Sequence, residues 1–133
     1  MSWRPVQAPD LAPMAQFAHA TVAGDFVFVS GMIGAGPDRR LVEGGVGPEL
    51  TQALRNAEQA LAAAGATLAD VCKVNVYLAA SGPDARDAMN AAYLAVLGDR
   101  PPARITVGTT ELALGAAVEI DCVAHLGDPT EHR

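Results

Sequence analysis

Two charged residues, Arg104 and Glu119, stand inside apolar, strand-like segments at 102–108 and 117–125. A full charge within a buried strand is costly unless it is paired or used. Arginine presents a planar fork of donors that holds a carboxylate in a fixed orientation, and glutamate can accept and return a proton. An arginine and a glutamate that could share one sheet face are therefore a reason to look for a functional site.

Alternation along these two segments assigns their side chains to faces. The side chains of a strand point alternately to its two sides. Arg104 and Thr106 therefore share one face of the first strand, opposite its apolar residues. Glu119 and Asp121 share one face of the second strand, again opposite an apolar face.

Bulk composition predicts a single globular domain, residues 1–133. The chain has 133 residues and 50% of them are apolar, which suits one modest core. The formal net charge is −6, and lysine and arginine form no cluster. Because nucleic-acid binding requires a basic face, we do not expect a nucleic-acid partner.

The length of the apolar segments and the placement of the two cysteines predict the cellular compartment. The longest apolar runs are too short to span a bilayer, and residues 1–5 contain no apolar core of a secretion signal. Cys72 and Cys122 lie in apolar, strand-like runs, so we expect two buried free thiols and no disulfide. We therefore expect a cytosolic protein without a membrane partner.

The N-terminal half predicts a β-hairpin followed by a helix. Residues 17–23 and 26–31 read as strands, and a Gly-Asp pair between them supplies the turn. After glycine-rich loops, we expect a helix with Pro48 as its first residue and Gly65 as its stop. Its apolar stripe at helical spacing consists of Leu50, Ala53, Leu54, Ala57, Leu61 and Ala64.

The C-terminal half predicts a strand, a helix and two further strands. Residues 70–78 alternate, with one apolar face that begins at Cys72. Ser81 is expected to cap the second helix and Gly98 to end it. The stripe of that helix consists of Ala85, Ala88, Met89, Ala92, Tyr93 and Val96. We expect a disordered tail from about residue 127.

This order of elements predicts an α+β domain with both helices packed on one sheet face. The other face is expected to carry polar side chains among small ones. Those side chains are Lys73, Asn75, Tyr77, Thr106 and Asp121. Such a face could be exposed to solvent, or it could be a subunit interface whose clefts hold Arg104 and Glu119, and the residues alone leave both interpretations open.

An ordered set of motifs carries a resemblance to a known family. The motifs are Gln16-Phe-Ala-His-Ala-Thr-Val-Ala-Gly-Asp-Phe-Val-Phe-Val-Ser-Gly31, Asn75-Val-Tyr, Met89-Asn-Ala-Ala-Tyr93, Pro102-Ala-Arg104 and Val118-Glu-Ile120. Across roughly residues 5–126 the chain resembles the Rid (YjgF-like) family of imine and enamine deaminases. The resemblance implies a chorismate-mutase-like α+β fold with a mixed sheet. It also implies a homotrimer with helices outside, sheets facing a central barrel, and active sites in the clefts between subunits.

The resemblance also implies roles for single residues. Arg104 falls on the arginine that holds the substrate carboxylate, and Glu119 on the glutamate that orients the hydrolytic water. The other substrate-binding positions of the family fall on Phe17, Ser30, Gly31, Asn90, Tyr93 and Thr106. The implied reaction converts a 2-imino acid or its enamine, such as 2-iminobutanoate or 2-iminopropanoate, into a 2-oxo acid and ammonia. It requires no metal and no cofactor.

Three positions depart from the family pattern. Phe17 replaces the usual tyrosine, and Ala15 with Gln16 replaces the Gly-Pro that commonly precedes it. Both changes bear on substrate geometry, and Phe17 indicates a more apolar pocket wall. Thr106 replaces a frequent cysteine, which matters less if that position acts through its backbone.

Structural interpretations of the same residues stay open. Arg104 and Glu119 could form an ion pair at an interface, and Asn90 and Tyr93 could pack the second helix. His19, His125 and His132 do not have the spacing of metal ligands. The glycines between positions 34 and 47 lack the pattern of a phosphate-binding loop, and we expect them to form a flexible loop near the mouth of the site.

Two other functions remain alternatives to a deaminase. One is a non-catalytic trimeric module that holds a small carboxylate metabolite in its clefts. The other is a ribonuclease or translation inhibitor, as some members of the family are described, although the acidic composition argues against it.

Overall fold

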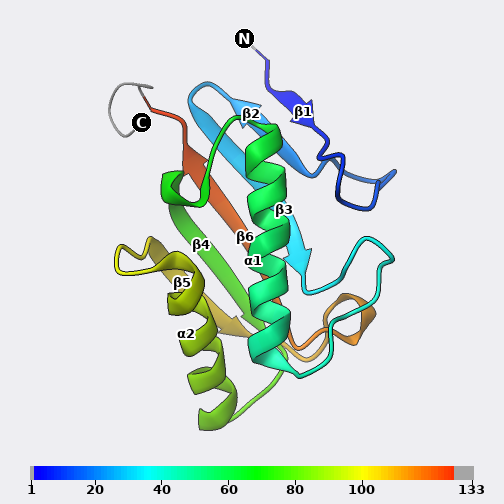
Figure 1. Ribbon diagram of the computed structural model, residues 1–133, viewed down its shortest axis with the longest axis vertical. Helices are drawn as coiled ribbons and strands as arrows, with labels where there is room; N and C mark the ends of the chain where they lie inside the picture. Colours follow the sequence, from blue (N-terminus) through cyan, green and yellow to red (C-terminus); the bar gives the residue numbers. More distant parts are fainter. Residues whose placement is uncertain (1, 128–133) are drawn as a thin grey trace.

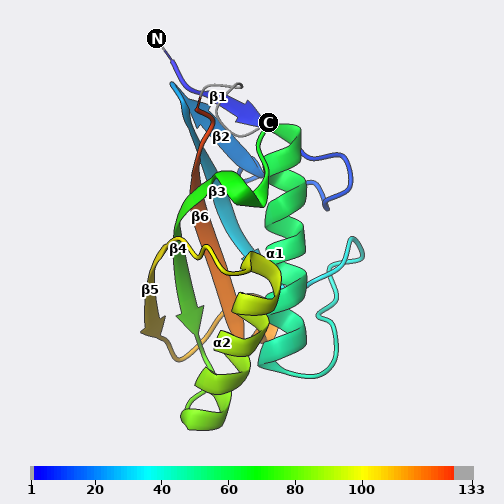
Figure 2. The ribbon, with the colours of Figure 1, turned by 60° about the vertical axis from the view of Figure 1, so that its left-hand side comes forward.

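The computed structural model describes residues 2–127, in which two helices cover one face of a six-stranded mixed sheet (Figure 1). The strands are β1 (Arg4–Val6), β2 (Ala20–Ala23), β3 (Phe26–Ile33), β4 (Val71–Leu78), β5 (Ala103–Gly108) and β6 (Val118–His125), and the helices are α1 (Val46–Ala63) and α2 (Pro83–Leu97). The sheet order is β1-β2-β3-β6-β4-β5, and only β4 and β5 pair in parallel. Figure 2 shows the two layers, helices on one side and sheet on the other. The predicted α+β arrangement is confirmed.

Several element boundaries differ from those predicted. The three-residue strand β1 is additional, and it is too short to show alternation in the sequence. Helix α1 begins at Val46, so Pro48 is its third residue, where a missing N–H still costs no intrahelical hydrogen bond. Gly82, not Ser81, is the residue before α2, and it makes no side-chain cap. The predicted tail beyond Gly127 lies outside the described residues.

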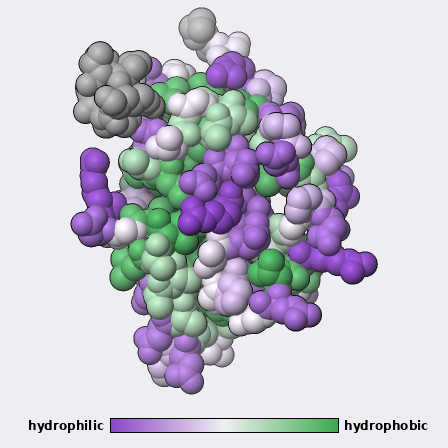
Figure 3. Space-filling model, viewed as in Figure 1, coloured by the Kyte–Doolittle hydropathy of each residue, from purple (hydrophilic) through white to green (hydrophobic). Residues whose placement is uncertain are grey.

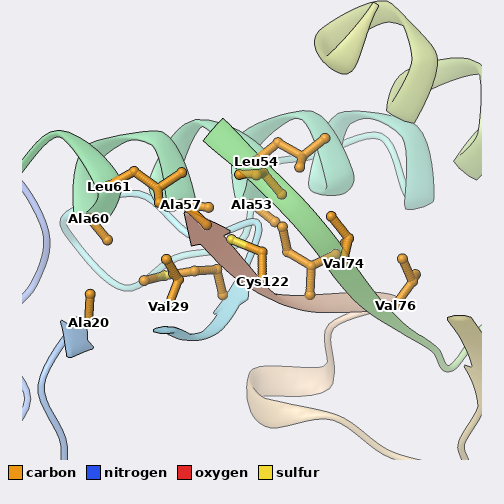
Figure 4. Packing of buried hydrophobic residues seen from close by; sticks show 14 of the residues in the cluster. Ala20, Val29, Ala53, Leu54, Ala57, Ala60, Leu61, Val74, Val76 and Cys122 are labelled. Atoms are coloured by element: carbon orange, nitrogen blue, oxygen red, sulfur yellow. The ribbon is translucent and has the colours of Figure 1, made fainter. Parts of the chain in front are cut away.

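The core forms where α1 packs on the centre of the sheet. The predicted stripe of α1 is buried along its length, and Figure 4 shows Leu54 and Leu61 above Val74 and Cys122. Helix α2 buries Met89 and Tyr93 fully, and Ala85, Ala92 and Val96 of its predicted stripe pack half-buried against the core, whereas Ala88 is exposed. Hydrophilic residues gather over the middle of the helix-covered surface in Figure 3, as expected for the outer side of α1.

A register shift in β4 corrects the prediction for Cys72. The pairing of β4 with β6 shifts between Val71 and Lys73, so Val71 is buried and Cys72 is exposed. A bulge of this kind inserts one residue and breaks the alternation that the sequence suggests. Cys122 is buried as predicted, and both thiols are free.

Strand register also corrects one face assignment. Thr106 is paired with Val76 and therefore lies on the helix-covered side, not with Asn75 and Tyr77. The face that the helices leave uncovered, here called the open face, carries Ile105 and Val107 of β5 instead. Because β5 is an edge strand, its apolar residues are not required to face the core of the same protomer.

The open face is thus mixed and not simply polar. Its centre is a hydrogen-bonded group in which the Asp121 carboxylate accepts from Asn75 Nδ2 at 2.7 Å and from the Tyr77 hydroxyl at 3.0 Å. Large apolar side chains surround this group and remain exposed. They are Phe26, Phe28, Ile105 and Val107, with exposed fractions of 39–51%.

The packing of α1 predicts a stability difference between two leucines. Leu54→Ala should lower the free energy of unfolding by about 2–5 kcal/mol, because a buried side chain is replaced by a cavity. Leu94→Ala on α2 is the matched control, since Leu94 is 52% exposed, and its effect should stay below about 1 kcal/mol. Urea unfolding at equal protein concentration measures both, and equal losses would contradict this account of the core.

Candidate functional site

Glu119 lies at the wall of a cavity of about 500 Å³, here called the Glu119 cavity. Its other lining residues come from the loop at 11–19, the end of β3 with the loop that follows it to residue 39, and residues 113–114 before β6, and α1 adds Asn56. Apart from α1, each segment is a connection or strand end, so side chains distant in sequence meet there. Sequence patterns placed Phe17, Gly31 and Glu119 here, but they gave no sign that Met14 and Leu114 complete the wall.

A bulge in β3 makes room for the Glu119 carboxylate. The pairing of β3 with β6 jumps between Val29 and Met32, and such bulges re-aim side chains. A Cβ atom at Gly31 would collide with the Glu119 carboxylate, so any other residue here would force that carboxylate to move. The Ser30 hydroxyl donates to the Ala18 carbonyl at 2.6 Å and ties the loop of Phe17 to β3. Ser30 therefore has a structural role beside any contact with a ligand.

His19 lines the cavity but has no free ring nitrogen. Its Nδ1 accepts the Ala8 backbone N–H at 2.9 Å, so its Nε2 carries the proton and donates to the Ala12 carbonyl at 2.8 Å. The ring is 3% exposed. These bonds fix the loop that forms one wall of the cavity, and they occupy both ring nitrogens of His19.

The surroundings of Glu119 favour its protonated form. Burial raises the pKa of the Glu119 carboxyl above its ordinary value, and the negative charge of Asp121 raises it further. A carboxylate with a raised pKa is a better proton acceptor near neutral pH than an exposed one. The hydrogen bond to Asp121 also raises the pKa of Tyr77, so that hydroxyl stays a donor.

Arg104 is held in place by α2. Its Nη1 donates to Asn90 Oδ1 at 2.9 Å, and its guanidinium lies 4.9 Å from the centroid of the Tyr93 ring. Asn90 and Tyr93 stand one helical turn apart and so support the same side chain. The structure thus brings these three predicted site residues together, here called the Arg104 group.

The guanidinium of Arg104 is exposed and available to a ligand. Within residues 2–127 the salt bridge is Arg55–Glu58, and Arg104 has no carboxylate partner there. Burial raises the pKa of Tyr93, although Arg104 opposes that effect. The hydroxyls of Tyr93 and Thr106 are buried and find no hydrogen-bond partner in the described part of the chain.

Arg104 and Glu119 lie on opposite faces of the sheet. Arg104 is paired with Val74 on the helix-covered side, and Glu119 is paired with Tyr77 on the open face. The two positions are also separated by three residues along the strand direction, which is about 10 Å, and by two strand spacings, which together are also about 10 Å. The expectation that they could share one face is therefore wrong for a single protomer. The pairing of β5 with β4 turns Arg104 to the helix-covered face, whereas the pairing of β6 with β4 turns Glu119 to the open face.

Other chemistry-bearing groups do not gather into a second site. Within residues 2–127, no three His, Cys, Asp or Glu side chains come together to hold a metal ion. Burial raises the pKa of the Cys122 thiol to about 12, so it remains protonated. His125 lies edge-on to the Phe26 ring at 5.0 Å between centroids, and His132 lies outside the described residues.

A family model described as endoribonuclease L-PSP matches residues 7–126. A RutC family protein of Pyrococcus horikoshii is 34% identical over 85% of this chain and 89% of its own length, and protein HMF1 of Saccharomyces cerevisiae is 33% identical over 85% and 86%. The chain belongs to the Rid (YjgF-like) family. Crystal structures agree: yeast Mmf1 has a TM-score of 0.84 at 32% identity over 93% and 98% of the two chains. RidA from an Antarctic Psychrobacter also has a TM-score of 0.84, at 28% identity over 92% and 98%.

Membership in the Rid family confirms the resemblance seen in the sequence and the fold that it implied. Among residues 2–127, no helix has the length and apolar character needed to cross a membrane. A Schizosaccharomyces pombe relative, 33% identical over 90% of this chain and 74% of its own length, is described as mitochondrial, so the cytosolic compartment stays a prediction.

Titration of Glu119 tests the electrostatics of the cavity. Folding raises this pKa, so the folded protein holds a proton that the unfolded chain releases. The contribution of Glu119 to stability should therefore fall as pH rises from the ordinary glutamate pKa through the raised one. An NMR titration of the Glu119 side-chain carbonyl carbon should show a raised midpoint, and Asp121→Asn should lower it by removing the neighbouring charge. A midpoint at or below the ordinary value would contradict this description.

Proposed function

We propose that this protein is a homotrimeric hydrolytic deaminase that converts 2-imino acids, or the enamines that tautomerise to them, into 2-oxo acids and ammonia. The observation that carries the proposal is a pair of complementary half-sites. One presents a positioned arginine that has no carboxylate partner among residues 2–127 of its own chain. The other presents a partly desolvated carboxylate at a cavity.

A second copy of the chain can unite the two halves. Arg104 and Glu119 cannot meet within one protomer, since they occupy opposite faces of its sheet. The open face between them exposes Phe26, Phe28 and Ile105, and exposed apolar patches of this kind mark interaction surfaces. Packing of the open faces around a three-fold axis would cover these side chains and set the Arg104 group of one subunit at the Glu119 cavity of the next.

The proposed mechanism uses each half for one task. Arg104 holds the substrate carboxylate through two parallel hydrogen bonds and so fixes the adjacent C=N carbon. Glu119 takes a proton from water as the water oxygen bonds to that carbon, and it passes this proton to the imine nitrogen, which gives a neutral carbinolamine. Glu119 then takes the proton of the new hydroxyl group and delivers it to the amino nitrogen. The C–N bond breaks as the C=O bond forms, and ammonia leaves with the electron pair of the C–N bond.

The same geometry leaves a binding module as the nearest alternative. A grip on a carboxylate requires Arg104 but has no use for a proton acceptor. The raised pKa of Glu119 favours catalysis over simple binding, because it makes the carboxylate a stronger proton acceptor than an ordinary glutamate.

The description of the family model makes RNA cleavage a second candidate. A formal net charge of −6 is unfavourable for binding a polyanion. Incubation of the protein with single-stranded RNA tests this candidate, and we expect no RNA cleavage that depends on Glu119.

Two substitutions separate catalysis from binding. Glu119→Gln should lower kcat by about 10²–10⁴-fold while binding of the 2-oxo acid product persists, because glutamine keeps the shape but cannot take up the proton. Arg104→Lys should lower kcat/KM, because the charge stays but the two-pronged geometry is lost. Ammonia release from imine generated in situ, less the spontaneous rate, measures both effects.

Matched controls and the assembly state complete this experiment. Glu58→Gln and Arg55→Lys alter an exposed ion pair on α1 and should leave turnover unchanged. Light scattering should give three times the 13.6 kDa chain mass for the wild type and for all four variants. Full activity in Glu119→Gln would remove the proton-transfer role, and a monomeric wild type would remove the shared site.

A further inference from the structure

The Glu119 cavity is larger and more apolar than the smallest 2-imino acids need. Its volume is about 500 Å³, within the range of pockets that enclose drug-sized ligands. The side chains of Leu11, Met14, Phe17, Ile33 and Leu114 line it. A methyl side chain would contact only a small part of this apolar wall.

Two polar side chains at the wall, those of His19 and Asn56, are already engaged with the protein. His19 uses both ring nitrogens on backbone groups. Asn56 donates to the carbonyls of Ile33 and Ala35, and its Oδ1 accepts from Gln52. A polar substrate side chain would therefore lose its water without gaining partners from these groups, which is unfavourable.

Arg39 is the cation at this wall, and one hydrogen bond ties its exposed side chain to the neighbouring loop. Its Nη2 donates to the Pro13 carbonyl at 2.6 Å, and the residue adopts a φ of 64°. This bond joins the loop after β3 to the loop that carries Met14, so it braces the apolar wall. The remaining donors of Arg39 are the one feature that would favour an acidic side chain, and the experiment below includes that case.

We propose that the site takes 2-imino acids with large apolar side chains, branched aliphatic, thioether or aromatic, in preference to 2-iminopropanoate and 2-iminobutanoate. This inference rests on the proposed hydrolytic function and specifies its substrate class. The carboxylate and the imine carbon occupy the junction of Arg104 and Glu119, and the side chain extends along Phe17, Met14 and Leu114.

Burial of the side chain sets the expected size of the preference. Each additional buried CH₂ group should raise kcat/KM by about fourfold. The leucine-derived imine carries three more carbons than the alanine-derived imine. It should therefore be the better substrate by roughly 10- to 100-fold, a ratio within what apolar pockets achieve.

The test is a substrate series with the trimeric wild-type protein. Imines are generated by excess amino-acid oxidase from alanine, 2-aminobutyrate, norvaline, leucine, methionine, phenylalanine and glutamate, and 2-oxo acid formation above the spontaneous rate is measured. We expect kcat/KM to rise with apolar size and glutamate to rank low. A flat series, a preference for alanine, or a preference for glutamate would each overturn the inference while the proposed function stands.

Two matched variants test whether the wall sets the preference. Leu114→Asn makes the wall more polar at a left-handed position that asparagine tolerates, and it should lower the leucine-to-alanine ratio of kcat/KM several-fold. Leu94→Asn makes the same change on α2, outside the cavity, and should keep the wild-type ratio. Equal leucine-to-alanine ratios of kcat/KM in both variants would show that Leu114 does not determine the substrate preference.

Binding of products separates failure of this inference from failure of the proposed function. Calorimetry should give tighter binding of 4-methyl-2-oxopentanoate than of pyruvate. If no imine is hydrolysed but this order of binding holds, the hydrolytic function is wrong and the apolar preference of the cavity stands. If turnover is absent and the order of binding is lost or reversed, both are wrong.

Discussion

The register of β5 against β4 is the constraint on which the proposed site depends. It turns Arg104 toward α2, where Asn90 and Tyr93 hold the guanidinium, while β6 turns Glu119 to the open face. A charge pair that would neutralise itself inside one protomer is thereby kept apart. Each group stays available, the arginine at an exposed edge and the glutamate at a cavity, and assembly of identical chains can complete the site without any extra element.

The loops around the Glu119 cavity show how an irregular wall can be kept rigid. His19 fixes residues 8–12 through two backbone bonds, Ser30 fixes Ala18, and Arg39 bridges to Pro13. At the same time, Gly31 lets the Glu119 carboxylate approach the backbone and lose part of its hydration, which raises its pKa. The loop contacts thus set the shape of the cavity, and the approach at Gly31 sets the surroundings of the carboxylate; precise positioning of a reactive group requires both.

Local patterns predicted most of the fold, but the arrangement of the site required long-range register. The stripe of α1 and the helix stops at Gly65 and Gly98 are local signals, and they were predicted correctly. Cys72 and Thr106 were assigned to the wrong faces, because a bulge and a strand-pairing offset leave no mark in the alternation of one segment. The wall at Leu114 depends on a left-handed backbone position in a connection, which no periodicity reveals.

Mixed trimers test most directly whether the site is shared between subunits. Arg104→Ala and Glu119→Gln, each inactive alone, are unfolded together in equal amounts and refolded as mixed assemblies. A site that takes Arg104 from one chain and Glu119 from the next is intact at one junction in four on random mixing, so about a quarter of wild-type activity should return. If both residues had to come from the same chain, no mixed junction would be intact. Mixed trimers without any regained activity would therefore contradict the account.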